Sequence, residues 1–204
     1  MSTEASAIRS SPDRLFEALR ERRSFKLKHL DPSPIDLALV ERMLEAANWA
    51  PSHGDTEPWR FVVFHGDGRG VIGRAMGEAY RAIRGEEEYT DEGRAAVEGK
   101  VWRAPVWIAL GVEPDPGRPE WEELVAFGCA VHNAQLMASA HGLASKWTSG
   151  STATHPAVAR AVGFGPEISL RGFLYVGRPA VPWPEGERRP LDEKIRWSDG
   201  TTAP

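Results

Sequence analysis

The sequence predicts a mixed α+β fold in which helices pack on a small sheet. Two observations carry this prediction: amphipathic helical patterns and short apolar strands interleave along the 204 residues, and several connections between them are short or irregular. Elements with one apolar face bury that face by packing in layers. With 41% hydrophobic residues and eight Trp, the chain can form a real core. Its length fits one domain, spanning residues 1–204.

Start signals and apolar spacing predict two N-terminal helices. The first begins at Ser11-Pro12-Asp13, where Ser can cap and Pro is tolerated at the first helical position. The second begins at Ser33-Pro34-Ile35-Asp36, which is close to a capping box. Apolar residues then recur at helical spacing: Leu15, Phe16 and Leu19 in the first helix, and Leu37, Val40, Met43, Leu44 and Ala47 in the second. Residues 61–64 follow as a buried strand.

The rest of the chain continues the alternation. The pattern predicts a helix at 70 to about 84, a charged stretch at 85–100, a strand at 106–112, a long helix at 121–140, a strand at 143–147, a short helix at 155–162 and a strand at 172–176. The long helix is apolar and rich in small residues, which is typical of a helix buried on more than one side. Residues 178–204 are Pro-rich and charged, so we expect an extended C-terminal tail that lies against another surface, such as another subunit.

Composition excludes several classes of protein. A formal charge of −4 and a pI near 5.9 argue against nucleic acid or an anionic membrane as the main partner. No apolar run approaches the roughly 20 residues of a membrane span, and Met1–Pro12 lacks the apolar region of a secretory signal. The lone Cys129 fits a reducing, cytoplasmic location and is interpreted as a small buried hydrophobe. The six His are scattered, so no metal site is predicted.

One motif resembles a dinucleotide-binding loop, an interpretation that we reject. Gly68–Gly73 matches G-x-G-x-x-G between a strand and a helix. A dinucleotide site also needs a second strand that ends in an acidic residue about 20 residues on. The acids near that distance, Glu86–Glu88 and Asp91–Glu92, follow no apolar strand. We therefore interpret the motif as a Gly-rich turn between a strand and a helix.

A cluster of cations and a hydroxyl, Arg22-Arg23-Ser24-Phe25-Lys26, directly follows the first helix. Arg can grip a phosphate with two hydrogen bonds, and a Ser hydroxyl can donate another. The alternative is a solvated helix end, where cations favour the helix dipole. One helix later comes an aromatic loop, Trp49 to Trp59, which opens into the first strand. Donors for an anion beside such a loop suit a flat cofactor with a phosphate tail.

These two segments, together with Lys146–Gly150 and Glu187–Asp192, resemble the nitroreductase family of flavin enzymes, compact type. The resemblance covers roughly residues 12–197, and it rests on the order and spacing of the four segments. It implies a three-layer α-β-α fold with a small mixed, mainly antiparallel sheet. It also implies a homodimer that binds FMN without a covalent bond at the subunit interface.

The resemblance further implies which residues bind the cofactor. Contacts to the phosphate and ribityl chain are implied for Arg22 and Ser24, with Arg23 beside them, and for Arg188 from the tail. Lys26 is implied near the flavin N1 and O2 edge, where a cation stabilises the reduced ring. Trp49 and His53 would reach the flavin of the neighbouring subunit. Backbone groups of Trp147, Thr148 and Ser149 would bond the ring edge. The alternatives are a strand and polar turn at 147–149 and an exposed tail charge at Arg188.

Two residues depart from the family's pattern, because Asp55 and Glu57 stand where Asn and Gln are common. An ionised Asp can only accept hydrogen bonds, so a direct contact of Asp55 with the flavin is in doubt.

The implied activity is an FMN-dependent oxidoreductase. NAD(P)H would reduce the flavin, and a nitroaromatic, quinone or similar acceptor would then take the electrons by a ping-pong mechanism. This scheme requires no side-chain acid or base, so no catalytic residue is predicted. The alternatives are a family relative with other flavin chemistry (dehalogenation, azole oxidation or flavin fragmentation) and a flavin-sequestering protein without turnover.

Overall fold

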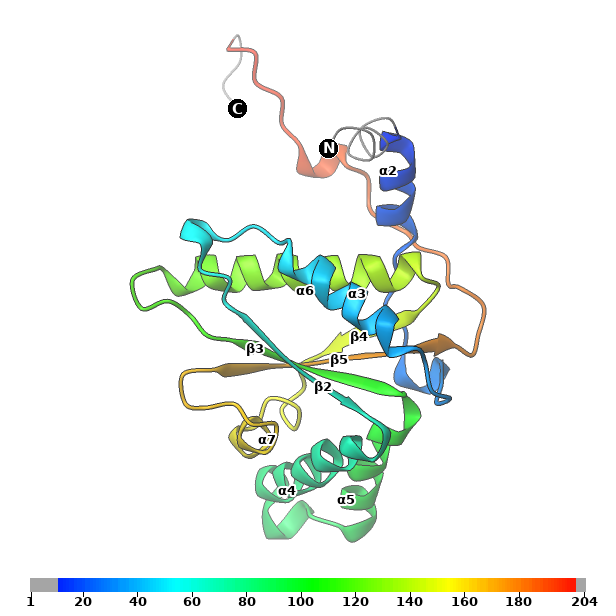
Figure 1. Ribbon diagram of the computed structural model, residues 1–204, viewed down its shortest axis with the longest axis vertical. Helices are drawn as coiled ribbons and strands as arrows, with labels where there is room; N and C mark the ends of the chain where they lie inside the picture. The colour runs from blue at the N-terminus through cyan, green and yellow to red at the C-terminus, as the bar shows by residue number, and fades with distance from the viewer. Residues whose placement is uncertain (1–10, 201–204) are drawn as a thin grey trace.

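A computed structural model describes residues 11–200, which form three layers (Figure 1). One layer consists of α3 (Leu37–Asn48) and α6 (Glu120–Ala140), with α2 (Pro12–Glu21) against α6. The opposite layer consists of α4 (Arg69–Glu88), α5 (Asp91–Glu98) and α7 (Pro156–Ala161). The predicted arrangement of helices on both faces of a sheet is therefore confirmed.

The middle layer is a five-stranded sheet. Its strands are β1 (Leu30–Asp31), β2 (Trp59–His65), β3 (Val106–Val112), β4 (Ala144–Thr148) and β5 (Ser169–Pro179). β3 lies between β2 and β5, while β4 and the short β1 also pair with β5. All of these pairings are antiparallel, and a single parallel bridge joins Ser24 to Ser145. A mainly antiparallel sheet is what the resemblance implied.

The central strand β3 connects the two halves of the core. All seven of its residues are buried, and successive side chains point to opposite faces of a strand. Four of them pack toward α3 and α6: Val106, Ile108, Leu110 and Val112. Trp107 and Ala109 pack toward α4 and α7. The continuous apolar run of β3 thus reflects a strand with a helical layer on each side.

The strand predicted at 61–64 is longer and less buried than expected. β2 runs over Trp59–His65 at one end of the sheet, and only Trp59 is buried. Trp59 anchors the strand, because its Nε1 donates to Asn48 Oδ1 of α3 at 3.0 Å. An edge strand has no neighbour on one side, which explains the partial exposure of its remaining residues.

The predicted capping of the first two helices is wrong in detail. Ser11 stands at the N-cap of α2, but its side chain makes no capping bond. α3 begins at Leu37 rather than after Ser33, and its cap is Asp36, whose Oδ1 accepts from the backbone N of Ala38 at 3.0 Å. Asp36 was a member of the predicted motif, but it serves as the cap itself.

The charged stretch at 85–100 also contains structure that the sequence pattern did not predict. α4 bends at Gly85, whose φ of 66° lies in the left-handed region, and ends at Glu88. α5 follows, and Thr90 caps it by accepting from the backbone N of Gly93 at 3.0 Å. Charged residues hid this helix because most of its surface faces solvent.

The Gly68–Gly73 motif belongs to the packing of α4 on its neighbours. A Cβ at Gly73 would lie 2.8 Å from the backbone oxygen of Glu98, so only glycine lets the segments approach so closely. The strand that precedes the motif, β2, pairs only antiparallel. A dinucleotide fold needs parallel strands at that point. The antiparallel pairing of β2 does not provide that arrangement.

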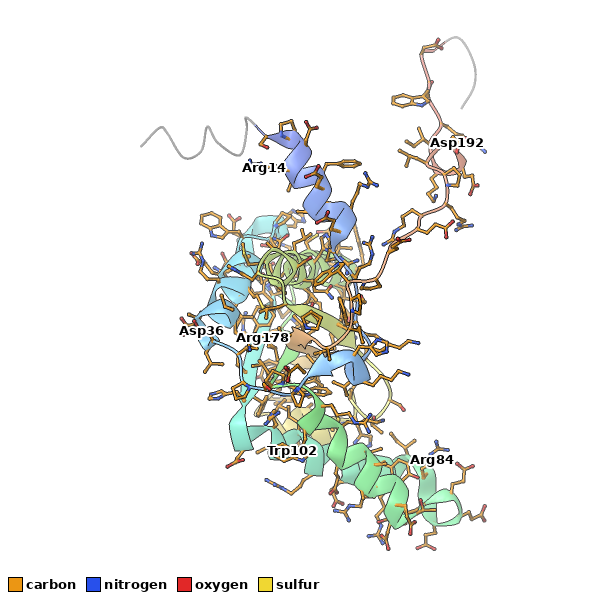
Figure 2. The ribbon with its side chains drawn as sticks, turned by 90° about the vertical axis from the view of Figure 1, so that its right-hand side faces the viewer. Arg14, Asp36, Arg84, Trp102, Arg178 and Asp192 are labelled. Atoms are coloured by element: carbon orange, nitrogen blue, oxygen red, sulfur yellow. The ribbon has the colours of Figure 1, made fainter. Side chains whose placement is uncertain are left out.

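The chain leaves the sheet after Pro179, and from there to residue 200 it contains only one short 3₁₀ turn, Asp192–Lys194. The first part of this segment is anchored, because Trp183 Nε1 donates to the backbone oxygen of Glu21 at 2.7 Å. Further on, the chain projects beside α2, and Asp192 lies well away from the sheet (Figures 1 and 2). Within residues 11–200, no helix is both long and apolar enough to cross a membrane.

Candidate functional site

The cation cluster after α2 is held in place by Phe25. The Phe25 side chain is 2% exposed, its backbone N donates to the oxygen of Ser145 at 3.1 Å, and its backbone oxygen accepts from the Tyr175 hydroxyl at 2.9 Å. Burial raises the pKa of Tyr175 to about 12, so this hydroxyl keeps its proton at neutral pH. The Phe25 ring packs edge-on against Trp183, with ring centroids 4.8 Å apart.

The residues on either side of Phe25 face outward. Ser24 and Lys26 are both exposed while Phe25 between them is buried, which is the alternation of an extended chain. Ser24 also forms the parallel bridge to Ser145 of β4. The sequence Ser-Phe-Lys thus places a hydroxyl and a cation on the exposed side of a segment fixed to the sheet.

Three guanidinium groups gather at the start of this segment. Arg22 is the C-cap of α2, and its pKa is lowered by burial and by the nearby cations Arg188 and Arg23. Arg23 donates to the backbone oxygens of Arg20 and Arg22 and lies against Gly186 of the tail. Residues far apart in the sequence, 22–23 and 188, therefore lie near one another.

This cluster has the properties of an anion site. The Nε atoms of Arg22 and Arg23 are both buried and have no hydrogen-bond partner among the described residues. No salt bridge within residues 11–200 neutralises Arg22, Arg23 or Arg188. Like charges close together repel, and a buried unpaired donor is costly. A phosphate would relieve both conditions at once.

The predicted ring-edge segment lies at the end of β4. Trp147 and Thr148 are its last residues, Ser149 follows and is exposed, and Trp147 Nε1 donates to the backbone oxygen of Arg171 at 2.8 Å. Gly172 on β5 has a φ of 116°, and a Cβ there would lie 2.1 Å from the Thr148 oxygen. Since Ser24 bridges Ser145 on the same strand, the cation cluster and this strand end belong to one region of the molecule.

Trp49 and His53 stand on and just after the end of α3. Trp49 ends α3 and is 82% exposed, in a groove formed with α2 and the C-terminal half of α6. His53 Nδ1 bonds Glu122 near the start of α6, and its Nε2 lies 3.1 Å from Arg118 Nη1. The contacts described for these two residues are with α2, α6 and Arg118. The resemblance assigns them to the neighbouring subunit's flavin.

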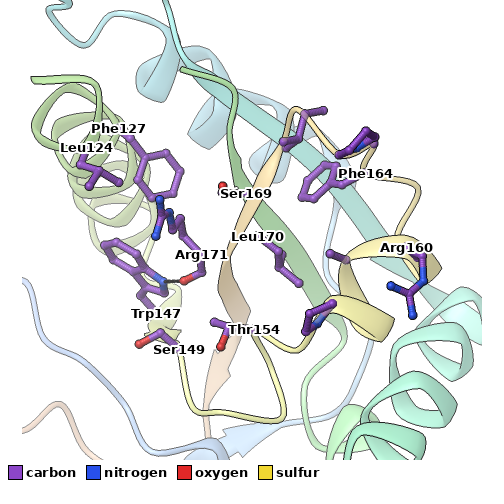
Figure 3. A pocket seen from close by; sticks show the side chains of 15 residues that line it. Leu124, Phe127, Trp147, Ser149, Thr154, Arg160, Phe164, Ser169, Leu170 and Arg171 are labelled. Atoms are coloured by element: carbon purple, nitrogen blue, oxygen red, sulfur yellow. Dashed lines mark hydrogen bonds between the residues drawn. The ribbon is translucent and has the colours of Figure 1, made fainter. Parts of the chain in front are cut away.

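A cavity of about 890 Å³ lies beside the ring-edge segment, between α6, α7 and the start of β5 (Figure 3). Trp147 and Ser149 line it together with Arg171 and Arg160. Neither arginine was among the predicted site residues, because each stands alone in the sequence within an otherwise apolar or small-residue segment. Trp183 and Tyr175 were missed for the same reason, since only the folded chain places them against Phe25.

Two other predictions concern the remaining chemistry of the chain. Cys129 was interpreted as buried, but it is only half-buried, on the outer side of α6 in a groove with His53 and Trp121. No cluster of three or more His, Cys, Asp or Glu suited to a metal ion occurs in the described part of the chain.

Asp55 and Glu57 both have positive φ, 54° and 45°, which Asn adopts more readily than most residues.

Comparison with known proteins agrees with this architecture. Residues 19–178 match the model of the nitroreductase family. A protein of Escherichia coli strain K12, provisionally named NAD(P)H nitroreductase YdjA, is 32% identical over 168 residues, with 81% of this chain and 88% of that protein covered. The 5,6-dimethylbenzimidazole synthase of Rhodospirillum rubrum is also 32% identical, over 197 residues, with 89% of each chain covered.

A solved structure shares this fold. A Desulfovibrio desulfuricans protein, provisionally described as a nitroreductase in complex with FMN, superposes with a TM-score of 0.70 and is 26% identical, with 91% of this chain and 97% of that chain covered. The family match covers well over half of the sequence and agrees with the observed layers and sheet. This chain is an oxidoreductase-type protein that belongs to the nitroreductase family.

Proposed function

We propose that the chain is an FMN-dependent oxidoreductase that takes electrons from NAD(P)H and passes them to a nitroaromatic, quinone or similar small acceptor. The observation that carries the proposal is the cluster of Arg22, Arg23 and Arg188. The buried Nε atoms of Arg22 and Arg23 have no hydrogen-bond partner within residues 11–200. The cluster lies beside the segment that bridges β4. Such a site fits the phosphate of FMN.

In this proposal each residue has a separate task. Arg22 and Arg188 hold the phosphate, Ser24 donates to the phosphate or ribityl chain, and Lys26 supplies positive charge next to the pyrimidine edge. Bound FMN supplies the capacity to accept a hydride and to pass on electrons. The backbone at Trp147 to Ser149 orients the ring edge, and no side chain has to act as an acid or base.

We further propose a homodimer, with Trp49 and His53 of one subunit beside the flavin of the other. The exposed apolar side chains of α6 and the 82% exposure of Trp49 support this assembly. A single domain over residues 1–204 and a cytoplasmic location, based on the lone Cys, belong to the same proposal.

A second candidate function is the fragmentation of flavin to 5,6-dimethylbenzimidazole. The observation that favours it is the Rhodospirillum rubrum synthase, which is as similar as the nitroreductase relative over a longer alignment. Both candidates need a flavin site, so they differ in the fate of the flavin. Supplying reduced FMN under oxygen and analysing the products would separate consumption of FMN from its recycling.

The absorption spectrum of the purified protein tests the cofactor first. We expect a yellow protein with bands near those of oxidised FMN, released on denaturation. Arg22→Ala should weaken FMN binding about tenfold or more, because a charge-assisted contact contributes roughly 1.5 to 3 kcal/mol. Arg23→Ala should weaken it less, and Arg14→Ala, an exposed Arg of α2, is the matched control. A colourless protein that binds no added FMN would end the proposal.

Steady-state kinetics test the mechanism. If one face of the flavin serves both substrates, the oxidised nicotinamide must leave before the acceptor enters, and double-reciprocal plots should be parallel. Gly70→Val should leave the affinity for NAD(P)H intact, because Gly70 belongs to a packed helix. Intersecting lines with a ternary complex would mean two separate sites.

A further inference from the structure

The cavity beside β4 is built like a binding site for a flat apolar molecule. Its volume, about 890 Å³, lies within the range of small-molecule sites, roughly 300 to 1,000 Å³. Aromatic and aliphatic side chains supply most of its walls: Leu124, Phe127, Trp147, Phe164, Ile168 and Leu170. The Phe127 and Trp147 rings meet edge-on with centroids 5.5 Å apart, which makes that wall rigid.

One wall carries a cation that the chain leaves partly unpaired. The side chain of Arg171 lies next to Phe127 and Trp147 (Figure 3). Its Nη2 donates to Glu120 Oε1 at 3.1 Å, but Glu120 is 67% exposed and contributes little in solvent. Its Nε is buried and has no hydrogen-bond partner among the described residues. A buried donor without a partner is costly, so an acceptor from a ligand would be favoured here.

The other side of the cavity adds compatible groups. Arg160 of α7 lines the cavity on the side away from Arg171 (Figure 3), and the hydroxyl-bearing side chains of Ser149 and Thr154 line it near Trp147. None of the residues that line the cavity, as the structure describes it, is acidic. Two cations and two hydroxyls among apolar walls select for a ligand that is both apolar and anionic.

We propose that this cavity binds an aromatic carboxylate, with the ring against Phe127 and Trp147 and the carboxylate on Arg171. A guanidinium recognises a carboxylate by paired, charge-assisted hydrogen bonds. Because Trp147 and Ser149 also belong to the predicted ring-edge segment, the ligand lies next to that segment. Its identity as the electron acceptor rests on the proposed function, whereas its binding does not.

The test compares two probes of the same shape, 2-naphthoate and 2-naphthamide, by titration calorimetry on the full-length protein as purified. We expect the carboxylate to bind about tenfold or more tightly than the amide, because only the carboxylate forms the charge-assisted bonds. Arg171→Gln should abolish this preference. The matched control is Arg60→Gln, which also removes an Arg paired with an exposed Glu, but on β2. That variant should keep the preference.

A second variant tests the cavity without changing charge. Ala159 lines it from α7, and Ala159→Phe should fill the space and weaken both probes, with the melting temperature reporting that the fold is intact. Equal binding of the two probes by the unaltered protein, or full binding by either cavity variant, overturns the proposal.

Flavin content, read from the visible spectrum of the same samples, keeps the two proposals apart. A colourless protein that still prefers 2-naphthoate would contradict the flavin function and leave the cavity site standing. Flavin that is retained while the probes fail to bind would contradict the cavity site alone. If Arg171→Gln lost flavin and probe together, Arg171 would be a structural support of β4, and the ligand site would be wrong.

Discussion

The two helical layers differ in how completely the chain itself covers them. In the layer of α4, α5 and α7, glycines bring the elements into close contact: a Cβ at Gly73 or Gly77 would lie within 3 Å of Glu98. The large exposed apolar residues on this side are Ile83 of α4 and Trp102 of the 3₁₀ helix Gly99–Arg103, which follows α5, each 45% exposed. Trp102 is stacked by Arg69, with the guanidinium 4.9 Å from the ring centroid.

The layer of α2, α3 and α6 is left open. α2 has no buried residue at all, and large apolar side chains are exposed along this whole layer: Leu15, Phe16, Leu19, Leu37, Trp49, Trp121 and Val125. Contiguous exposed apolar surface usually marks an interaction site. The comparison teaches that both helical layers contribute to the core, but that the layer of α2, α3 and α6 also leaves a row of apolar side chains exposed, as the proposed dimer requires.

The largest effect should come from placing a charge on the open layer. Val125 on α6 is 58% exposed, and a two-fold axis would bury the substitution twice. Val125→Arg should therefore raise the dissociation constant of the proposed dimer by about a hundredfold or more, roughly 3 kcal/mol. Light scattering across a dilution series measures it.

The matched control lies in the layer of α4, α5 and α7, which is called the closed layer from here on. Ile83→Arg changes a similarly exposed apolar residue of α4 and should leave the mass unchanged. A monomeric parent protein with flavin still bound would contradict both the dimer and the placement of Trp49 and His53.

The next effect concerns the closed layer's packing. Gly73→Ala should lower the free energy of unfolding by about 1 to 3 kcal/mol, because its Cβ would meet the Glu98 backbone oxygen at 2.8 Å. Gly70→Ala is the control, since the nearest atom there is the flexible end of Arg74 at 3.2 Å. Urea unfolding should show Gly70→Ala as neutral or stabilising, and equal losses at both positions would contradict this account of the layer.

The sequence predicted the layered fold and the cation cluster because both depend on local patterns. Periodicity gave the helices and β3, and the run from Arg22 to Lys26 is continuous in the chain. What it missed depends on distance: α5 is too charged to show an apolar stripe, and β1 has only two residues. Arg171 and Trp183 act through partners about 50 and 160 residues away, which no local pattern reveals.

Trp183 of the tail offers a smaller effect at the end of α2. Its Nε1 bond to the Glu21 oxygen and its ring on Phe25 tie the tail to the turn that carries Arg22. Trp183→Phe removes the bond and keeps the ring, so it should weaken FMN binding by about fivefold, or ~1 kcal/mol. The control is Trp197→Phe, a tail residue that is 88% exposed. Fluorescence titration with FMN would show whether the anchor matters, and identical affinities for the two variants would contradict it.

The smallest effects should be equal in the two layers, which tests whether their difference lies in packing rather than in the helices themselves. Asp36 caps α3 in the open layer and Thr90 caps α5 in the closed layer, each by accepting one backbone N–H at 3.0 Å. Asp36→Ala and Thr90→Ala should each lower the free energy of unfolding by about 0.5 to 1 kcal/mol, because both caps are exposed.

Ser33→Ala provides the reference for both caps. Ser33 lies outside α3, and its backbone N, which the substitution leaves in place, bonds Asp31 Oδ1 at 2.8 Å. Replacing the Ser33 side chain by a methyl group should change the free energy of unfolding by less than about 0.5 kcal/mol, as is usual for surface substitutions. A loss at Ser33 as large as that at Asp36 would restore the capping box suggested by the sequence. Unequal losses at Asp36 and Thr90 would instead mean that the helices, and not only their packing, differ between the layers.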